Sequence, residues 1–212
     1  MFPSLRTDIS ARFAAVETHL KVAPRKPPDF AKSIRGLAFI QIYGSYEYTV
    51  RTLTDAVLSH ITLRGHRFYR LRPSLLAVFL DAELNSFEDV GEDKEWDRRL
   101  ALFEKAFSRN LIPAVSVRPH DGSHFRHTQL QMLFRALGIT RALTLRKRHL
   151  YLIDEIVDKR NSIAHGEESP IDVGSRYSRQ DMLQKTQNMR SICLRLVSVL
   201  EEYCASPANH LR

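Results

Sequence analysis

The stretch from Leu152 to Glu168 reads LIDEIVDKRNSIAHGEE. From Leu150 onward its apolar residues recur at the three- and four-residue spacing of one helix face. The members of this apolar stripe are Leu150, Ile153, Ile156, Val157, Ile163 and Ala164. Gly166 follows the stripe directly, and glycine commonly ends a helix. The pattern predicts an amphipathic helix that ends at Gly166.

Arg160 falls on this stripe, four residues after Ile156 and three before Ile163. Arginine is rarely buried without a partner, so a cation at this position is unusual. His165 sits at the end of the helix, where free carbonyls and the helix dipole favour a cation. Taken alone, such an Arg is usually a snorkelling or interface residue and such a His is usually a cap. Acid–base chemistry is the other interpretation, since histidine ordinarily titrates near neutral pH.

The rest of the chain is also helical in pattern, and we see no sheet and no repeats. Apolar periodicity predicts helices over residues 4–22, 30–63, 73–87, 96–107, 128–137 and 140–164, and a last helix capped by Ser178 that runs to Tyr203. Gly36 and Gly44 weaken the long second helix locally or let a neighbour approach closely. We expect an all-α bundle. Residues 1–28 form an N-terminal helix and Pro-rich linker, 29–205 the helical domain and 206–212 a tail.

Charge and compartment narrow the function further. Lys and Arg number 32 against 24 acidic residues, a formal net charge of +8 that attracts polyanions, although a merely basic protein fits equally well. No apolar run approaches the ~20 residues that span a bilayer, and MFPSLRTDIS does not resemble a signal peptide. Cys193 and Cys204 fall ~16 Å apart on one predicted helix, too far for a disulfide. We therefore expect free thiols, a cytoplasmic protein and no membrane contact.

Residues 160–166, RNSIAHG, resemble the signature of HEPN domains: an Arg, four to six residues, then a His, with a polar residue directly after the Arg. Here the gap is four residues and the polar residue is Asn161. AFIQIYGSYEYTVRTLTDAV (38–57) resembles the first core helix of the RiboL-PSP-HEPN-like, restriction- and toxin-associated group, in which an acidic residue follows an aromatic; Glu47 matches it. Residues 125–139 are similar to that group as well. The resemblance covers about residues 30–203.

This resemblance implies a HEPN-type bundle that cuts RNA without a metal, leaves a cyclic phosphate and works as a homodimer. Arg160, His165, Asn161 and Glu47 are the catalytic residues that it implies. Arg160 and His165 stand about 140° apart around an ideal helix, so one copy does not easily focus both on one phosphate. Two copies facing across a two-fold axis do, because such an interface brings the same patch together twice.

Candidate RNA contacts and metal ligands lie elsewhere. Lys159 precedes the motif, and Arg64, Arg67 and Arg70 interleave with Phe68 and Tyr69 in a basic turn that suits single-stranded RNA, or is a solvated loop with its aromatics in the core. His120, His124 and His127 cluster near Asp121, but their spacing matches no closed zinc site and histidine also contacts RNA. We expect no metal and no cofactor.

We expect a HEPN endoribonuclease that acts as a toxin or antiviral effector. The alternative is a HEPN-fold module that binds RNA or a partner protein without cutting, but such a module has no need of an Arg on its apolar stripe. In some HEPN toxins a Tyr two residues after the His is modified by a partner nucleotidyltransferase. Glu167 stands there in this chain, which leaves an antitoxin of another kind or a restriction- or defence-system partner.

Overall fold

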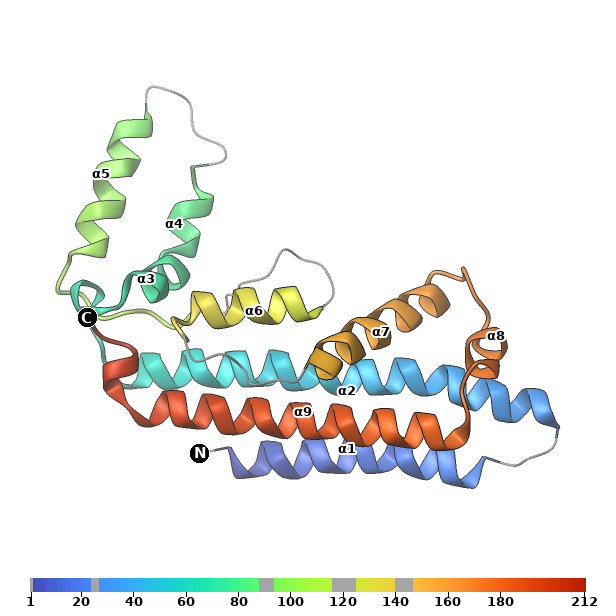
Figure 1. The fold of residues 1–212 in the computed structure, drawn as a ribbon. Coiled ribbons are helices and arrows are strands. Elements are labelled where there is room, and N and C mark those ends of the chain that lie inside the picture. The colour runs from blue at the N-terminus through green and yellow to red at the C-terminus, as the bar shows by residue number, and fades with distance from the viewer. Residues whose placement is uncertain (1, 24–26, 88–93, 116–124, 140–146) are drawn as a thin grey trace. The chain divides into compact units, whose positions relative to one another are not determined.

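The structure of this chain is a computed structural model that describes residues 2–23, 27–87, 94–115, 125–139 and 147–212. Its helices are α1 (Pro3–Val22), α2 (Pro28–Leu63), α3 (Pro73–Phe79), α4 (Asp81–Asn85), α5 (Glu95–Ala106), α6 (His127–Ala136), α7 (Lys147–Ala164), α8 (Pro170–Ser175) and α9 (Arg179–Ala205) (Figure 1). Among the described residues, the 3₁₀ turn η1 (Phe68–Arg70) lies between α2 and α3, and the 3₁₀ turn η3 (Pro207–Asn209) follows α9. Within these ranges the only extended pairings are two isolated bridges. The all-α prediction is confirmed.

The chain divides into two compact units, and each is described by itself. Unit 1 comprises Met1–Thr52, Ser123–Gln129 and Leu143–Glu201, and unit 2 comprises Leu53–Gly122, Leu130–Ala142 and Glu202–Arg212. The HEPN-like motif on α7 belongs to unit 1, and the basic turn belongs to unit 2. The boundaries expected at residues 28 and 205 stay predictions.

Three long helical segments form the frame of unit 1, namely α1, the first part of α2, and α9 (Figure 1). Helix α1 buries the stripe Leu5, Ile9, Phe13, Val16 and Leu20. Near its start Arg6 pairs with Glu201 of α9 at 2.5 Å, and near its end His19 contacts Gln41 of α2 at 3.2 Å. Helix α1 therefore packs along both neighbours and is an integral part of unit 1.

Helix α8, which the sequence did not predict, lies tightly against α2. A Cβ atom on Gly36 of α2 would come within 2.0 Å of the Pro170 carbonyl oxygen, and one on Gly174 of α8 within 1.9 Å of the Lys32 carbonyl oxygen. The Arg35 side chain adds a hydrogen bond of 2.9 Å to the Gly174 carbonyl. Gly36 thus permits the close approach that its place in a helix suggested, whereas a Cβ on Gly44 would meet open space.

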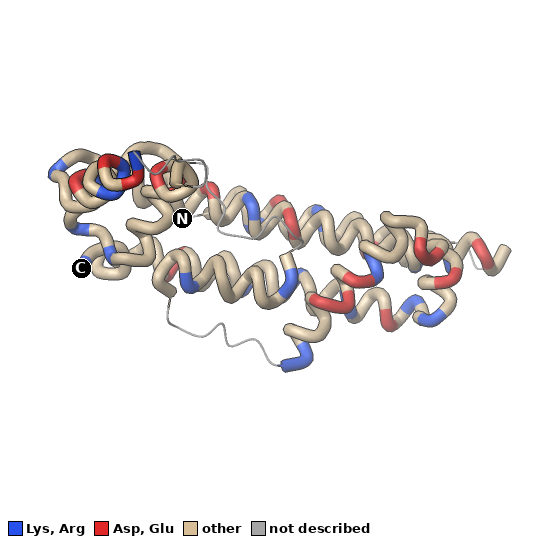
Figure 2. The backbone as a smooth tube through the Cα atoms, turned by 90° about the horizontal axis from the view of Figure 1, so that it is seen from above, with Lys and Arg blue, Asp and Glu red and all other residues tan. Residues whose placement is uncertain are grey.

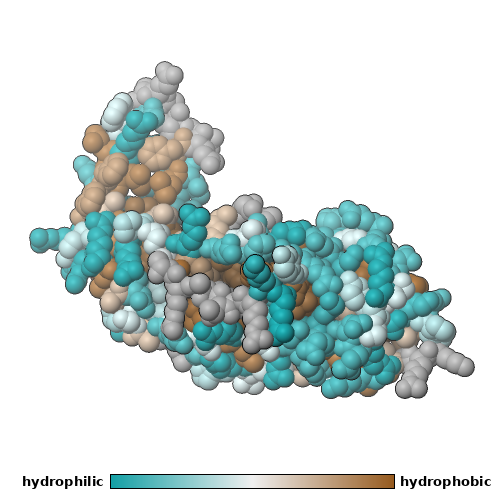
Figure 3. All heavy atoms as spheres, viewed as in Figure 1, coloured by the Kyte–Doolittle hydropathy of each residue, from teal (hydrophilic) through white to brown (hydrophobic). Residues whose placement is uncertain are grey.

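Unit 2 departs from the prediction in two places. The single helix expected over residues 73–87 is two, α3 and α4, because the backbone turns at Leu80 (φ −109°, ψ 14°). Helix α5 forms where its periodicity predicts, but its apolar stripe faces outward. Trp96, Leu100, Phe103 and Phe107 are 68%, 60%, 62% and 58% exposed, and Figure 3 shows apolar residues gathered there. Periodicity located this helix without indicating which side it buries.

Two further expectations concern membranes and thiols. Across the described ranges, no helix combines the length and the apolar character that a membrane span requires. Cys193 and Cys204 are both buried and both free, on the one helix α9, as predicted.

Candidate active site at the end of α7

The end of α7 is built by a specific hydrogen-bond pattern around Gly166. Gly166 has a positive φ of 73°, a conformation that side chains with a Cβ atom rarely adopt. The Gly166 N–H donates to the Ile163 carbonyl at 3.2 Å, and the Glu167 N–H to the Ser162 carbonyl at 2.9 Å. These two bonds form a Schellman motif. The helix ends where the sequence predicted, and it leaves His165 exposed at its last turn.

Arg160 has two partners that account for a cation on the apolar stripe. Its guanidinium carbon lies 4.7 Å from the centroid of the Tyr43 ring on α2. Its Nη1 also donates to the Asn161 side-chain oxygen at 3.0 Å. A cation over an aromatic face is attracted by the ring quadrupole. Arg160 is therefore half-buried and held in position rather than snorkelling freely.

Asn161 connects the two ends of the motif. Residues four apart on a helix are neighbours on its surface, so Asn161 and His165 share one face of α7. The His165 N–H also donates to the Asn161 backbone carbonyl at 2.9 Å. Around the axis of α7, Asn161 therefore lies between Arg160 and His165, and its side-chain oxygen accepts the hydrogen bond from the Arg160 guanidinium. This gives a half-buried cation, an amide and an exposed imidazole in sequence around one helix end.

Glu47 lies beside Tyr43, the tyrosine that contacts Arg160. Burial raises the pKa of Tyr43, Glu47 raises it further, and Arg160 and a backbone hydrogen bond from Phe125 lower it. Glu47 itself pairs with Arg51, one turn further along α2, at 2.7 Å. Tyr43 and Arg51 were missed at the sequence level, although Tyr43 stands four residues before Glu47 and so shares its helix face.

The comparison with protein families covers most of the chain: the model of the RiboL-PSP-HEPN family matches residues 7–202. The chain belongs to this family. The match begins 23 residues before the Phe30 start of the resemblance and takes in most of α1, in agreement with the packing of that helix. No curated protein and no solved structure matched this chain.

In this HEPN chain Lys159, a predicted RNA contact, is tied to the segment after the motif. Its Nζ lies 3.4 Å from Glu168, and its side chain is 24% exposed. Glu168 also accepts hydrogen bonds from Arg176 and from the Ser162 hydroxyl, and these partners lower its pKa to about 2. Glu168 therefore braces the turn that carries His165 and Gly166. A direct role of Lys159 on RNA stays a prediction.

The basic turn of the HEPN chain is described within unit 2 alone. Arg67 donates to the Arg109 carbonyl at 2.5 Å, and Arg64 to the His60 ring at 3.4 Å. Phe68 is 2% exposed and Tyr69 41%, so one of the two aromatics is in the core and one is available for stacking. Along the described helices, basic residues are interleaved with acidic ones (Figure 2). The roles of Arg64, Arg67 and Arg70 on RNA remain predictions.

Of the histidine cluster, His120 and His124 lie outside the described residues. His127 begins α6 and is held by Asp154 of α7. Its backbone N–H donates to one carboxylate oxygen at 3.1 Å, and its ring Nδ1 lies 2.6 Å from the other. Within the described ranges, no group of three or more His, Cys, Asp or Glu side chains is arranged to hold a metal. Asp154 thus joins α6 to the helix that carries the HEPN motif.

Proposed function

We propose that this chain is a metal-independent endoribonuclease of the HEPN class. The observation that carries the proposal is the run Arg160–Asn161–His165, in which a guanidinium held over Tyr43 bonds to the amide that neighbours an exposed histidine. A forked guanidinium suits a phosphate oxygen pair. Histidine suits proton transfer near neutral pH.

RNA supplies its own nucleophile, the 2′-hydroxyl. In the proposed reaction His165 takes the proton from this hydroxyl as its oxygen attacks the adjacent phosphorus. The bond from phosphorus to the 5′-oxygen breaks, and a protonated His165 gives that leaving oxygen a proton. The products are a 2′,3′-cyclic phosphate and a free 5′-hydroxyl, so atoms and protons balance. Arg160 offsets the charge that builds on the phosphate in the transition state.

Two copies of the chain complete this site in the proposal. A homodimer that pairs α7 helices brings two copies of His165 and of Arg160 to one cleft, so one His acts as base and the other as acid. The exposure of Ala164 and His165 leaves this face of unit 1 available for such a pairing. Light scattering should give the mass of a dimer at micromolar concentration, and a monomer there contradicts this part of the proposal.

A non-catalytic HEPN module remains the second candidate, and one observation favours it. Arg160 already stacks on Tyr43 and bonds to Asn161, so a structural role alone would explain a cation on the apolar stripe. Such a module would bind RNA or a protein partner without cutting. Substitution of His165 separates the two candidates, because His165 is exposed and has little packing to lose.

The test is cleavage of single-stranded RNA in excess EDTA, with end-group analysis of the products. We expect cyclic-phosphate ends, full activity after chelation, and a loss of about 10²–10⁴-fold in His165→Ala at unchanged melting temperature. His19→Ala, an exposed histidine of α1, is the matched control and should keep full activity. Activity that needs a divalent ion overturns the mechanism. A fully active His165→Ala overturns the site.

The cellular role belongs to the same proposal. A toxin or antiviral effector that acts on cytoplasmic RNA should arrest growth when it is expressed, and His165→Ala should relieve the arrest. Growth that is equally unaffected by both proteins would favour an RNA-processing role.

A further inference from the structure

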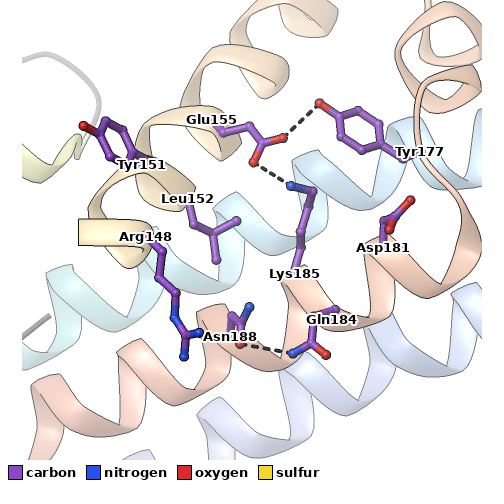
Figure 4. Close-up of a pocket in the computed structure, with 9 residues that line it drawn as sticks. All are labelled: Arg148, Tyr151, Leu152, Glu155, Tyr177, Asp181, Gln184, Lys185 and Asn188. Atoms are coloured by element: carbon purple, nitrogen blue, oxygen red, sulfur yellow. Dashed lines mark hydrogen bonds and ion pairs between the residues drawn. The ribbon is translucent and has the colours of Figure 1, made fainter. Parts of the chain in front are cut away.

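A cleft of about 560 Å³ opens between α7 and the first turns of α9, entirely within unit 1 (Figure 4). Its walls include Arg148, Tyr151, Leu152 and Glu155 from α7, Tyr177 from the loop before α9, and Lys185 from α9. Clefts of roughly 300–1,000 Å³ commonly hold small ligands. This volume therefore suits one nucleotide-sized group.

The charges deep in the cleft are already paired with one another. Glu155 accepts a hydrogen bond from the Tyr177 hydroxyl at 3.0 Å and pairs with Lys185 at 2.6 Å, as Figure 4 shows. The Lys185 ammonium also lies 5.2 Å from the centroid of the Tyr177 ring. At the rim, Asp181 accepts the Ser178 N–H at 2.8 Å and so serves the start of α9. These groups fix the walls and leave little net charge for a ligand.

Other groups of the cleft are unused. Among the described residues, Arg148 makes no hydrogen bond or ion pair, and Tyr151 is 73% exposed. The Gln184 amide donates to the Asn188 carbonyl oxygen at 3.2 Å, and among the described residues neither the Gln184 carbonyl nor the Asn188 amide N–H groups have a further partner. An unstacked nucleotide requires a cation for its phosphate, an aromatic face for its base, and hydrogen-bond acceptors and donors for its base edge, and the cleft offers one or more of each.

We propose that this cleft binds one unstacked nucleotide of the RNA, with its phosphate on Arg148, its base on Tyr151 and its base edge on Gln184 and Asn188. The proposal rests on the proposed function in taking RNA as the ligand. Tyr151 and His165 are fourteen residues apart, so they lie on nearly the same side of α7, about 21 Å apart along its axis. The bound nucleotide is therefore several positions away from the cut.

The probe is a fluorescent 2′-O-methyl RNA of about eight nucleotides, which has no free 2′-hydroxyl and is not cleaved. Anisotropy should show that Tyr151→Ala weakens binding about tenfold while Tyr151→Phe, which keeps the ring, binds normally. Arg148→Ala should weaken binding. It should also lower the magnitude of the slope of the logarithm of the binding constant against the logarithm of the salt concentration by about 0.7, the contribution of one phosphate contact in single-stranded RNA. Arg12→Ala is the matched control, because Arg12 is also exposed but stacks on Tyr48 away from the cleft.

Cleavage of RNA by the same variants separates this inference from the proposed function. We expect Tyr151→Ala to raise KM and leave kcat unchanged. If RNA is cut but neither cleft variant changes binding or KM, the subsite is wrong and the nuclease stands. If the probe binds through Arg148 and Tyr151 but nothing is cut, the subsite stands and the nuclease is wrong. The inference is overturned if the wild-type protein does not bind the probe. It is also overturned if the cleft substitutions weaken binding to a protein partner but leave binding to the RNA probe unchanged.

Discussion

The Arg160 guanidinium of α7 stacks over the Tyr43 ring of α2, with 4.7 Å between the guanidinium carbon and the ring centroid. This contact joins the motif helix to the longest helix of unit 1. It also resolves an anomaly in the sequence, because a cation on an apolar stripe needs a partner and an aromatic face is one. The stacking sets the direction in which the guanidinium points, and Asn161 restricts it further through a 3.0 Å hydrogen bond.

Tyr43 should therefore act as a positioning residue for Arg160. We expect Tyr43→Phe, which keeps the ring, to retain RNA cleavage within about threefold. Tyr43→Leu removes a cation–π contact worth about 1 kcal/mol and should lower kcat about five- to tenfold. Melting temperatures of both variants, measured beside kcat, separate lost positioning from lost folding. Equal activity of the two variants at equal folded fraction would show that the stacking does not direct Arg160.

Arg160 itself should be intolerant of lysine. Arg160→Lys keeps the charge but loses the planar fork, so we expect cleavage to fall at least about 10²-fold. Arg160→Ala loses the stacking on Tyr43 but also removes two like charges from the proposed dimer cleft. The melting temperature of the dimer should therefore stay within a few degrees of wild type. A fully active Arg160→Lys variant would exclude forked phosphate binding.

The sequence predicted local features well and long-range partners poorly. The helix end at Gly166, the cap at Ser178 and the long helix α2 follow from neighbouring residues and were confirmed. The partner of Arg160 lies on another helix, more than a hundred residues away in sequence, where only the resemblance around Glu47 drew attention to the region. Helix α8 was missed because six residues are too few to carry a periodic pattern. The sequence did not indicate that the apolar stripe of α5 is exposed, because burial depends on what packs nearby.

Two glycines of α2, Gly36 and Gly44, provide a test substitution and a matched control for the packing of α8 against α2. Gly36→Ala places a Cβ 2.0 Å from the Pro170 carbonyl oxygen, so α8 must shift, and we expect a loss of about 2 kcal/mol in the free energy of unfolding. Gly44→Ala meets open space in the same helix and should gain about 0.5–1 kcal/mol, because alanine loses less backbone entropy. Urea unfolding measures both changes. Equal effects of the two substitutions would contradict the close contact between α2 and α8.

Unit 2 should lose stability in mild acid because of His210. Its side chain is 0% exposed, and among the described residues neither ring nitrogen has a hydrogen-bond partner. The rings of Tyr203, His66 and His60 lie 4.9, 5.7 and 6.3 Å from it, centroid to centroid. Burial lowers the pKa of His210 from 6.5 to about 4, and the nearby side chains of His66, His60, Arg64 and Arg72 act in the same direction.

The direction of this pH dependence of stability follows from proton uptake by the unfolded chain. Between pH 6.5 and about 4 the unfolded chain binds a proton at this residue and the folded chain does not, so the free energy of unfolding falls as the pH falls. Below the pKa of His210 in the folded chain, the loss in the free energy of unfolding is complete. It amounts to about 3 kcal/mol, because each unit of pKa difference corresponds to ~1.4 kcal/mol. His210→Phe keeps an aromatic ring without a titrating group, so its urea-unfolding free energy should change less between pH 7 and 4.5 than that of wild type. His19→Asn, which alters an exposed histidine, should keep the wild-type dependence. If His210→Phe and wild type lose the same stability over this range, the pKa of His210 does not differ between the folded and unfolded chains, and the acid sensitivity of unit 2 has another origin.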